Sequence, residues 1–291
     1  MTTRTPDIVA VIGGGRMGAG IAQVFATLGG TVTVAEAGDR EAATARITEG
    51  LEAAARKGEL PGTTPEEVLR RVSVVGAITH LPAEAALVVE AVPEDITLKI
   101  DVLVAAEKTV GPEAVIASNT SSLPIGELGA VLANPARFLG MHFFNPVPAS
   151  SLVEIVRSAA TGEPAVAEVH DWVTALGKEG IVVNDFPGFA TSRLGVALGL
   201  EAIRMLEGGV ADAEAIDRAM ELGYRHAMGP LRSTDLVGLD VRLAIAEHLA
   251  AELGPRFEPP QLLRDKVARG ELGRKTGQGF HTWNTSKKEM R

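Results

Sequence analysis

Short apolar runs alternate with stretches of helical spacing over the first two thirds of the chain. Residues 8–12 form a β-branched run that is too short for a helix, which predicts a buried strand. After a glycine triplet, apolar residues recur at spacings of three and four, which predicts an amphipathic helix with the stripe Met17, Ile21, Val24, Phe25 and Leu28. Residues 31–35 alternate as a second strand, so this segment is expected to be a βαβ unit.

The same alternation continues beyond this unit. A charged helix is expected at about residues 39–57, and further strands are expected at residues 71–75, 86–92, 114–118, 138–143, 152–156 and 180–183. Most of these runs are separated by helical stretches, and sequences of this kind build a largely parallel sheet covered by helices. The fold class is therefore predicted to be α/β, with a doubly wound sheet of the Rossmann type.

The strand signals stop at the Pro187-Gly188 pair, which breaks both patterns. We therefore expect two domains, covering residues 1–184 and 185–291. In the second domain, helices are expected at residues 212–222, 236–249 and 262–267, and helical spacing is kept by the stripe Leu194, Leu198, Ile203 and Leu206. The second domain is predicted to be all helical, and its stripe is assigned to the domain core or to a subunit interface.

Composition narrows the class of protein. The 291 residues are 46% hydrophobic and 22% charged, as in an ordinary folded protein, and the net charge of -9 provides no general attraction for nucleic acid or anionic membranes. The chain has no cysteine, which excludes disulfides, thiolate nucleophiles and cysteine-based zinc sites. The histidines lack metal-ligand spacing, so no metal is expected. Neither a membrane span nor a secretory signal is expected, which favours a cytoplasmic location.

A glycine motif opens the first predicted helix. Gly13-x-Gly15-x-x-Gly18 follows a strand, and Glu36 stands 18 residues past Gly18 at the end of the next strand. This is the dinucleotide fingerprint, in which Gly13 allows the turn, Gly15 admits the pyrophosphate and Gly18 lets helix and strand pack closely. Glu36 is suited to accept hydrogen bonds from ribose hydroxyls and would repel a 2′-phosphate, so we expect NAD rather than NADP. The alternatives are a flexible glycine loop and a solvated carboxylate at a strand end.

Polar clusters follow two other predicted strands. Glu94 and Asp95 follow residues 86–92, and Asn119 to Ser122 follow residues 114–118, where ligands bind in open α/β sheets. Such residues also serve as helix caps.

His142 and Glu154 lie in successive apolar runs, where a polar side chain needs a partner. A hydrogen bond between them would satisfy both and leave the second imidazole nitrogen as a general base. The alternative is a purely structural buried pair.

Together these residues resemble the 3-hydroxyacyl-CoA dehydrogenase family, over essentially the whole chain. The resemblance rests on Gly13-Gly-Gly-Arg-Met-Gly18, Ala91-Val-Pro-Glu-Asp95, Ser118-Asn-Thr-Ser-Ser122, Gly140-Met-His-Phe-Phe-Asn-Pro146, Leu152-Val-Glu-Ile155, Asp185-Phe-Pro-Gly-Phe189, Gly229-Pro230 with Asp235, and Gly273-Arg-Lys-Thr-Gly-Gln-Gly-Phe280. It implies an NAD-dependent oxidation of (3S)-3-hydroxyacyl-CoA, with a short chain such as 3-hydroxybutyryl-CoA, and the reverse reaction. It also implies a homodimer formed through the C-terminal helices.

The resemblance assigns roles to individual residues. His142 is implied to be the general base, Glu154 its orienting carboxylate, and Ser121 a partner of the substrate hydroxyl. Positions implied to contact NAD are Glu94, Lys99, Asn145 and Lys275, and Met17 and Asn119 lie in matched motifs at the same site. Lys57 matches a contact to coenzyme A, although a solvated helix end explains it equally well. It follows Arg40, Arg46 and Arg56 on a helix that offers local cations.

Two positions depart from the family pattern. Ser192 stands where the family has an asparagine that reaches the substrate, and serine can still donate a hydrogen bond, with a shorter reach and one polar group instead of two. His281 stands where tyrosine is common. Two alternatives stay open at this stage, which are a dehydrogenase of a non-CoA hydroxy acid on the same scaffold and a non-catalytic NAD-binding structural protein.

Overall fold

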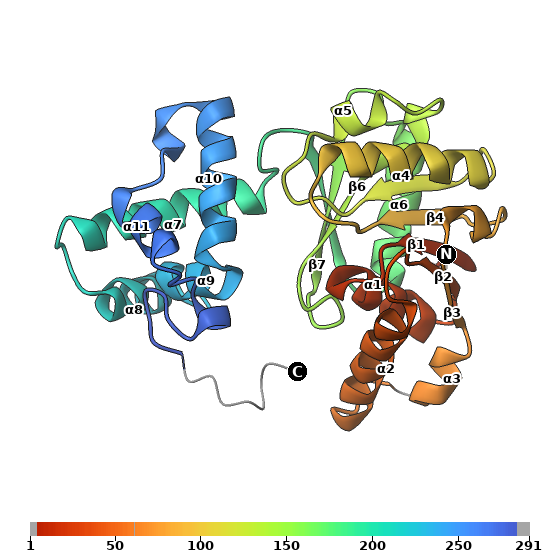
Figure 1. Cartoon of the computed structure of the whole chain (residues 1–291), viewed down its shortest axis with the longest axis horizontal. Coiled ribbons are helices and arrows are strands. Elements are labelled where there is room, and N and C mark those ends of the chain that lie inside the picture. The colour runs from red at the N-terminus through yellow and green to blue at the C-terminus, as the bar shows by residue number, and fades with distance from the viewer. Residues whose placement is uncertain (1–4, 61, 284–291) are drawn as a thin grey trace. The chain divides into compact units, whose positions relative to one another are not determined.

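The computed structural model describes residues 5–60 and 62–283, and the chain divides into two compact units, residues 1–186 and 187–291. The first unit contains one eight-stranded sheet in the order β3-β2-β1-β4-β5-β6-β7-β8 (Figure 1). Its strands are β1 (Ile8–Ile12), β2 (Thr31–Ala35), β3 (Val72–Val75), β4 (Leu87–Glu90), β5 (Val115–Ser118), β6 (Phe138–Phe143), β7 (Leu152–Arg157) and β8 (Glu179–Asn184). Each predicted strand is present, and the predicted Rossmann-type α/β fold is confirmed.

The helices of this unit connect the parallel strands. They are α1 (Arg16–Thr27), α2 (Arg40–Arg56), α3 (Pro65–Leu69), α4 (Ile96–Thr109), α5 (Ile125–Gly129) and α6 (Glu163–Ala175), with short 3-10 turns η1 (Ile78–His80) and η2 (Pro135–Arg137). Aspartate side chains cap the N-termini of α2 and α4. Asp39 accepts from the Ala42 N–H, and Asp95 accepts from the Leu98 N–H. In the described part of the chain, no helix is both long and apolar enough to cross a membrane.

One strand pair breaks the parallel pattern. β6 and β7 are antiparallel, whereas every other neighbouring pair in the sheet is parallel. The eight residues between them are too few for the crossover that a parallel pair needs, so the chain turns back instead. The resulting register places His142 directly opposite Glu154.

The core of the first unit lies on both faces of the sheet. Strands β1, β2 and β4 are covered on both sides, so their side chains are almost continuously apolar and buried rather than alternating. The most deeply buried large residues include Phe25 and Ile21 of α1 and Ile47 of α2. The helices therefore hold the carboxyl ends of the central strands in fixed positions.

The second unit is helical, as predicted (Figure 1). It contains α7 (Thr191–Glu207), α8 (Ala213–Gly223), α9 (Pro230–Val237), α10 (Leu239–Leu253) and α11 (Gln261–Ala268), with 3-10 turns η3 (Pro255–Phe257) and η4 (Arg274–Thr276). The prediction of one helix at residues 236–249 is wrong, because two helices meet within this range. Gly238 has a φ of 107°, a left-handed value that an α-helix cannot contain, so α9 ends and α10 begins there.

The apolar stripe predicted along α7 is only partly buried. Ile203 lies in the core with Val196 and Leu200, but Leu194 is 70% exposed. Helical spacing identifies a helix here without identifying which of its apolar residues face inward.

Two buried aspartates hold the end of the second unit in place. Asp235 accepts hydrogen bonds from the backbone N–H groups of Phe280 and His281 and from the indole N–H of Trp283, each at 2.8 Å. Asp217 accepts from the first N–H groups of α9 and lies 2.8 Å from His281 Nε2. Residues 280–283 are thus anchored to α8 and α9.

We expect two glycines of α1 and its preceding loop to differ sharply in their tolerance of a side chain. A Cβ at Gly18 would lie 1.8 Å from the Gly13 carbonyl oxygen, whereas a Cβ at Gly15 would meet no atom within 4 Å. Gly18→Ala should therefore lower the free energy of unfolding by about 2 kcal/mol, and Gly15→Ala by less than about 0.5 kcal/mol. Urea denaturation measures both. Equal losses in the two variants would contradict the packing assigned to Gly18.

Candidate active site

A cavity of about 580 Å³ opens at the carboxyl ends of β1, β2 and β4. Gly13, Gly15, Met17 and Glu36, four residues expected at the cofactor, line it together. Gly13 has a φ of 101° and a Cβ there would lie 2.8 Å from the Ala91 oxygen, so the turn requires glycine. The open space beside Gly15 lets a phosphate approach the backbone at the beginning of α1. The lining of the cavity fits a dinucleotide.

Glu36 is held at the rim of this cavity by backbone groups. Its two carboxylate oxygens accept from the N–H groups of Gly14 and Gly38, each at 2.7 Å. Each oxygen keeps a lone pair for a ligand hydroxyl. Arg46 lines the same cavity and donates to the Gly14 oxygen at 3.1 Å, so this cation lies at the glycine loop.

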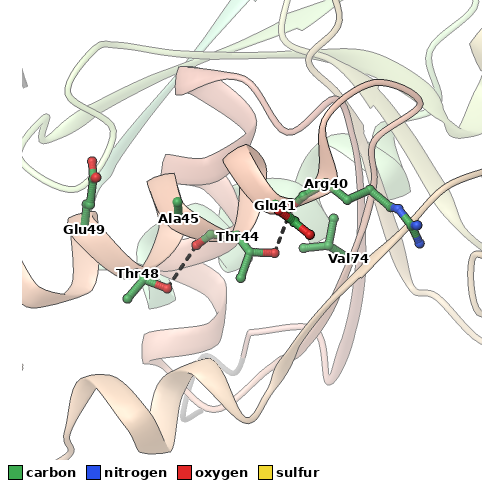
Figure 2. A pocket seen from close by; sticks show the side chains of 7 residues that line it. All are labelled: Arg40, Glu41, Thr44, Ala45, Thr48, Glu49 and Val74. Carbon is green, nitrogen blue, oxygen red and sulfur yellow. Dashed lines mark hydrogen bonds between the residues drawn. The ribbon is translucent and has the colours of Figure 1, made fainter.

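A second hollow of about 540 Å³ lies over the outer face of α2 and β3 (Figure 2). Its seven lining residues include no buried one. Thr44 and Thr48 donate their hydroxyls to carbonyl oxygens of their own helix, those of Arg40 and Thr44 (Figure 2). The two hydroxyls are therefore used within α2, and the residues expected at the cofactor line the cavity at the strand ends instead.

His142 and Glu154 form a hydrogen-bonded pair inside the sheet. His142 Nδ1 lies 2.7 Å from Glu154 Oε2, and the glutamate is fully buried while the histidine is 7% exposed. A carboxylate acceptor at Nδ1 places the ring proton there, so Nε2 carries the lone pair. The Phe144 ring, 4.4 Å from the imidazole between centroids, packs beside it. This arrangement equips Nε2 to accept a proton.

Two side chains, those of Lys178 and Val147, fix the loop that follows His142. Lys178 Nζ donates to the carbonyl oxygens of Val147 and Ser150, and burial lowers the pKa of this lysine. Val147 packs against Gly20, where a Cβ would approach the valine Cβ to 2.8 Å. The loop is therefore tied to α1, the helix that begins at the cofactor cavity.

A charge network that the sequence analysis missed lies under the carboxyl ends of β4 and β5. Glu90, fully buried, accepts from Lys99 Nζ at 2.7 Å, from the Val92 N–H at 2.7 Å and from the Ser118 hydroxyl at 2.5 Å. Lys99 is 1% exposed and also contacts the Val92 oxygen and Glu94 Oε2, so its three donors are used within the protein. Glu90 lies within an apolar run of the sequence. Its charge among apolar neighbours is the one signal that could have pointed to it.

Glu94 links this network to the loop after β5. Its Oε1 accepts from the Thr120 hydroxyl at 2.6 Å, the Ser121 N–H at 3.0 Å and the Ser122 hydroxyl at 3.0 Å. Burial raises the pKa of Glu94, but the Thr120 hydrogen bond and the Lys99 charge outweigh it and hold the pKa below its usual value. Asn119 Oδ1 accepts from the Phe143 N–H at 2.9 Å, which ties the same loop to β6. Ser121 is thus positioned by neighbours on both sides.

Comparison with known proteins identifies the family. Residues 8–186 match the model of the 3-hydroxyacyl-CoA dehydrogenase NAD binding domain, and residues 188–283 match that of the family's C-terminal domain. The chain is 41% identical over 280 residues to a 3-hydroxybutyryl-CoA dehydrogenase of Mycobacterium tuberculosis, covering 94% of this chain and 98% of the relative. It is 37% identical over 286 residues to the mitochondrial hydroxyacyl-coenzyme A dehydrogenase of Sus scrofa, covering 94% and 90%. The crystal structure of (S)-3-hydroxybutyryl-CoA dehydrogenase from Ralstonia eutropha has a TM-score of 0.91 at 37% identity, covering 97% of this chain and 100% of that one.

The chain belongs to the 3-hydroxyacyl-CoA dehydrogenase family. It is an oxidoreductase that acts on CH–OH groups and uses NAD, so the predicted family, enzyme class and cofactor are confirmed.

The remaining predicted residues of this dehydrogenase are dispersed. In the first unit, Lys57 is exposed at the end of α2 and Asn145 is exposed after β6. Lys275 and Ser192 belong to the second unit, where Lys275 Nζ lies 2.6 Å from both carboxylate oxygens of Asp240 and Ser192 lies in the first turn of α7. Within the described residues, no group of three or more acidic or histidine side chains is arranged to hold a metal ion.

We expect the Glu90–Lys99 pair to stabilise the dehydrogenase measurably. Glu90→Gln leaves a buried ammonium without its closest counter-charge, so the free energy of unfolding should fall by about 3 kcal/mol. Glu94→Gln removes a carboxylate that is one third exposed and should cost less. The double variant Glu90→Gln/Lys99→Met should lose less than the sum of its single changes, as measured by urea denaturation. Additive losses would show that the pair is not coupled.

Proposed function

We propose that the dehydrogenase oxidises short-chain (3S)-3-hydroxyacyl-CoA thioesters, such as 3-hydroxybutyryl-CoA, to 3-ketoacyl-CoA and catalyses the reverse reduction. The substrates named for its relatives support this proposal. The observation that carries it is the buried His142–Glu154 pair, with Nδ1 and Oε2 2.7 Å apart on β6 and β7. The neighbouring strand β5 leads to the loop that holds Ser121, so the base on β6 and the hydroxyl after β5 belong to adjacent strands.

The proposed roles follow from the chemistry of an alcohol oxidation. NAD, when bound, would supply the acceptor for the hydride of C3 of the substrate. His142 Nε2 takes the proton of the 3-hydroxyl, and Glu154 orients the ring and stabilises the positive charge that develops on it. The Ser121 hydroxyl donates to the substrate oxygen. In the reduction, His142 returns the proton to the same oxygen.

The proposed binding residues divide by ligand. Gly13, Gly15 and Met17 hold the pyrophosphate region of NAD, with Gly18 supporting their loop, and Glu36 accepts from its ribose. Further contacts are proposed for Glu94, Asn119, Asn145 and Lys275. Because the donors of Lys99 are used inside the protein, we assign it to positioning Glu94 rather than to direct contact. Lys57 attracts the phosphates of coenzyme A, and Ser192 contacts the acyl group.

A cofactor oxidation assay tests the proposal. Purified full-length protein should oxidise NADH in the presence of acetoacetyl-CoA, but not with free acetoacetate, and far more slowly with NADPH. Loss of the requirement for coenzyme A would favour a hydroxy-acid dehydrogenase on the same scaffold. NADH binding without turnover of either compound would favour a non-catalytic protein.

A substitution of the proposed base gives a sharper test. His142→Gln keeps an N–H donor for Glu154 but has no basic nitrogen, so kcat should fall by about 100-fold or more while NADH affinity is retained. His80→Gln is the matched control, because His80 is exposed on η1. A kcat for His142→Gln within a few-fold of the control would remove His142 from the mechanism.

We also propose a homodimer formed through the second unit. Of the twelve large hydrophobic residues exposed in the described chain, seven lie in this unit, namely Leu194, Val210, Leu222, Tyr224, Leu236, Val237 and Val241. A unit that exposes several large apolar side chains is suited to form a subunit interface.

The dimer proposal predicts a mass of about twice 30.4 kDa by light scattering. The substitution Leu222→Lys should shift the protein toward the monomer. Val182→Lys, at an exposed apolar residue of the first unit, should leave the mass unchanged. A monomeric wild-type protein would overturn the proposal.

A further inference from the structure

Arg242 of α10 is a buried cation without a counter-charge. It is 6% exposed, and within residues 5–60 and 62–283 no carboxylate pairs with its guanidinium and its Nε has no hydrogen-bond partner. Burial lowers the pKa of Arg242 to about 10, so it stays charged at neutral pH. The other buried charges of this unit, Asp217 and Asp235, are fully supplied with donors. An unpaired buried charge is costly, which points to a partner that arrives from outside the chain.

The guanidinium lies along one face of α7. A Cβ at Gly199 would be 3.9 Å from Arg242 Nε, and a Cβ at Gly195 would be 3.4 Å from Arg242 Nη1. The side chain therefore extends from Gly199 toward Gly195, in the direction of the helix N-terminus. Ser192 precedes Gly195 by three residues and shares this face one turn further on. The two glycines leave the space that the arginine occupies.

The surroundings of Arg242 add donors and positive potential. The hydroxyl of Thr234 is fully buried, lies 2.9 Å from the Cβ position of Gly199, and has no hydrogen-bond partner among the described residues. The N-terminus of α7 contributes the positive end of its dipole, an arrangement that repels a second cation and attracts an anion. Guanidinium binds carboxylate with two parallel hydrogen bonds, so a carboxylate matches this site in charge and geometry.

We propose that Arg242 binds an anionic oxygen group of the acyl-CoA, and that the preferred substrates are 3-hydroxyacyl-CoA thioesters whose acyl chain ends in a carboxylate. This inference rests on the proposed function, because Ser192 occupies the position at which the family resemblance places a substrate contact. Arg242 extends along α7 toward Ser192, and for this reason we assign the anion to the acyl chain. The phosphates of coenzyme A are the other source of the same chemistry, and the experiment separates the two.

The test compares substrates of equal acyl length. Wild-type kcat/KM should be at least about tenfold higher for 3-oxoadipyl-CoA, which ends in a carboxylate, than for 3-oxohexanoyl-CoA, which does not. Arg242→Met keeps an unbranched apolar side chain without the charge and should abolish this preference while leaving 3-oxohexanoyl-CoA turnover within a few-fold. Arg218→Met, at an exposed arginine of α8, should retain the preference. Arg242→Met should also keep or raise the midpoint of urea denaturation, since an unpaired buried charge is removed.

Each outcome bears on a separate claim. Equal wild-type kcat/KM for the two six-carbon substrates would overturn the acyl carboxylate site while leaving the proposed function intact. Failure to turn over any CoA thioester, acetoacetyl-CoA included, would instead defeat the proposed function. If Arg242→Met lowers kcat/KM equally for both CoA substrates but not for their pantetheine thioesters, the anion is a phosphate and the acyl assignment is wrong. The wild-type ratio decides the matter even if Arg242→Met fails to fold.

Discussion

The antiparallel pairing of β6 with β7 is the constraint on which the catalytic geometry depends. It buries Glu154 in a strand whose neighbouring residues Val153 and Ile155 are apolar, and a carboxylate in that position needs a donor. The register supplies His142 directly opposite. A slip of one residue would turn Glu154 to the other face and leave both polar groups unpaired, so the pairing selects one register strongly. The stability of the sheet and the orientation of the base therefore have the same origin.

Charge is distributed differently in the two units. In the first unit, Glu90, Lys99 and Glu94 form a continuous network that reaches the loop carrying Ser121. Lys178 donates to two carbonyl oxygens and has no acidic partner within the part of the chain that the structure describes. In the second unit, two aspartates accept hydrogen bonds from N–H donors, whereas the buried Nε of Arg242 has no hydrogen-bond partner among the described residues. The paired charges thus stabilise the fold, whereas the unpaired charge of Arg242 is suited to bind a ligand.

Much of the fold and part of the site followed from the sequence. The strands were predictable because each is a short apolar run bounded by turn residues, and the cofactor loop because its glycines and Glu36 have a fixed spacing. The role of Glu90 could not be predicted, because its partner Lys99 lies nine residues later on a helix. Only the turn between them brings the two charges together. The helix break at Gly238 was missed because glycine inside an apolar pattern does not reveal its φ. Arg242 was overlooked for a related reason, since periodicity does not show which charged residue of a helix is covered.

The anchoring of residues 280–283 has a consequence for how the helical unit forms during synthesis. Asp235 is buried and takes all three of its donors from this short stretch, 45 residues or more further along the chain. Until the ribosome has released those residues, α9 carries a carboxylate that the nascent helices cannot satisfy. The first unit has its complete sheet long before that point. The nucleotide-binding half can therefore form during translation, whereas the helical half closes only after residues 280–283 have been synthesised.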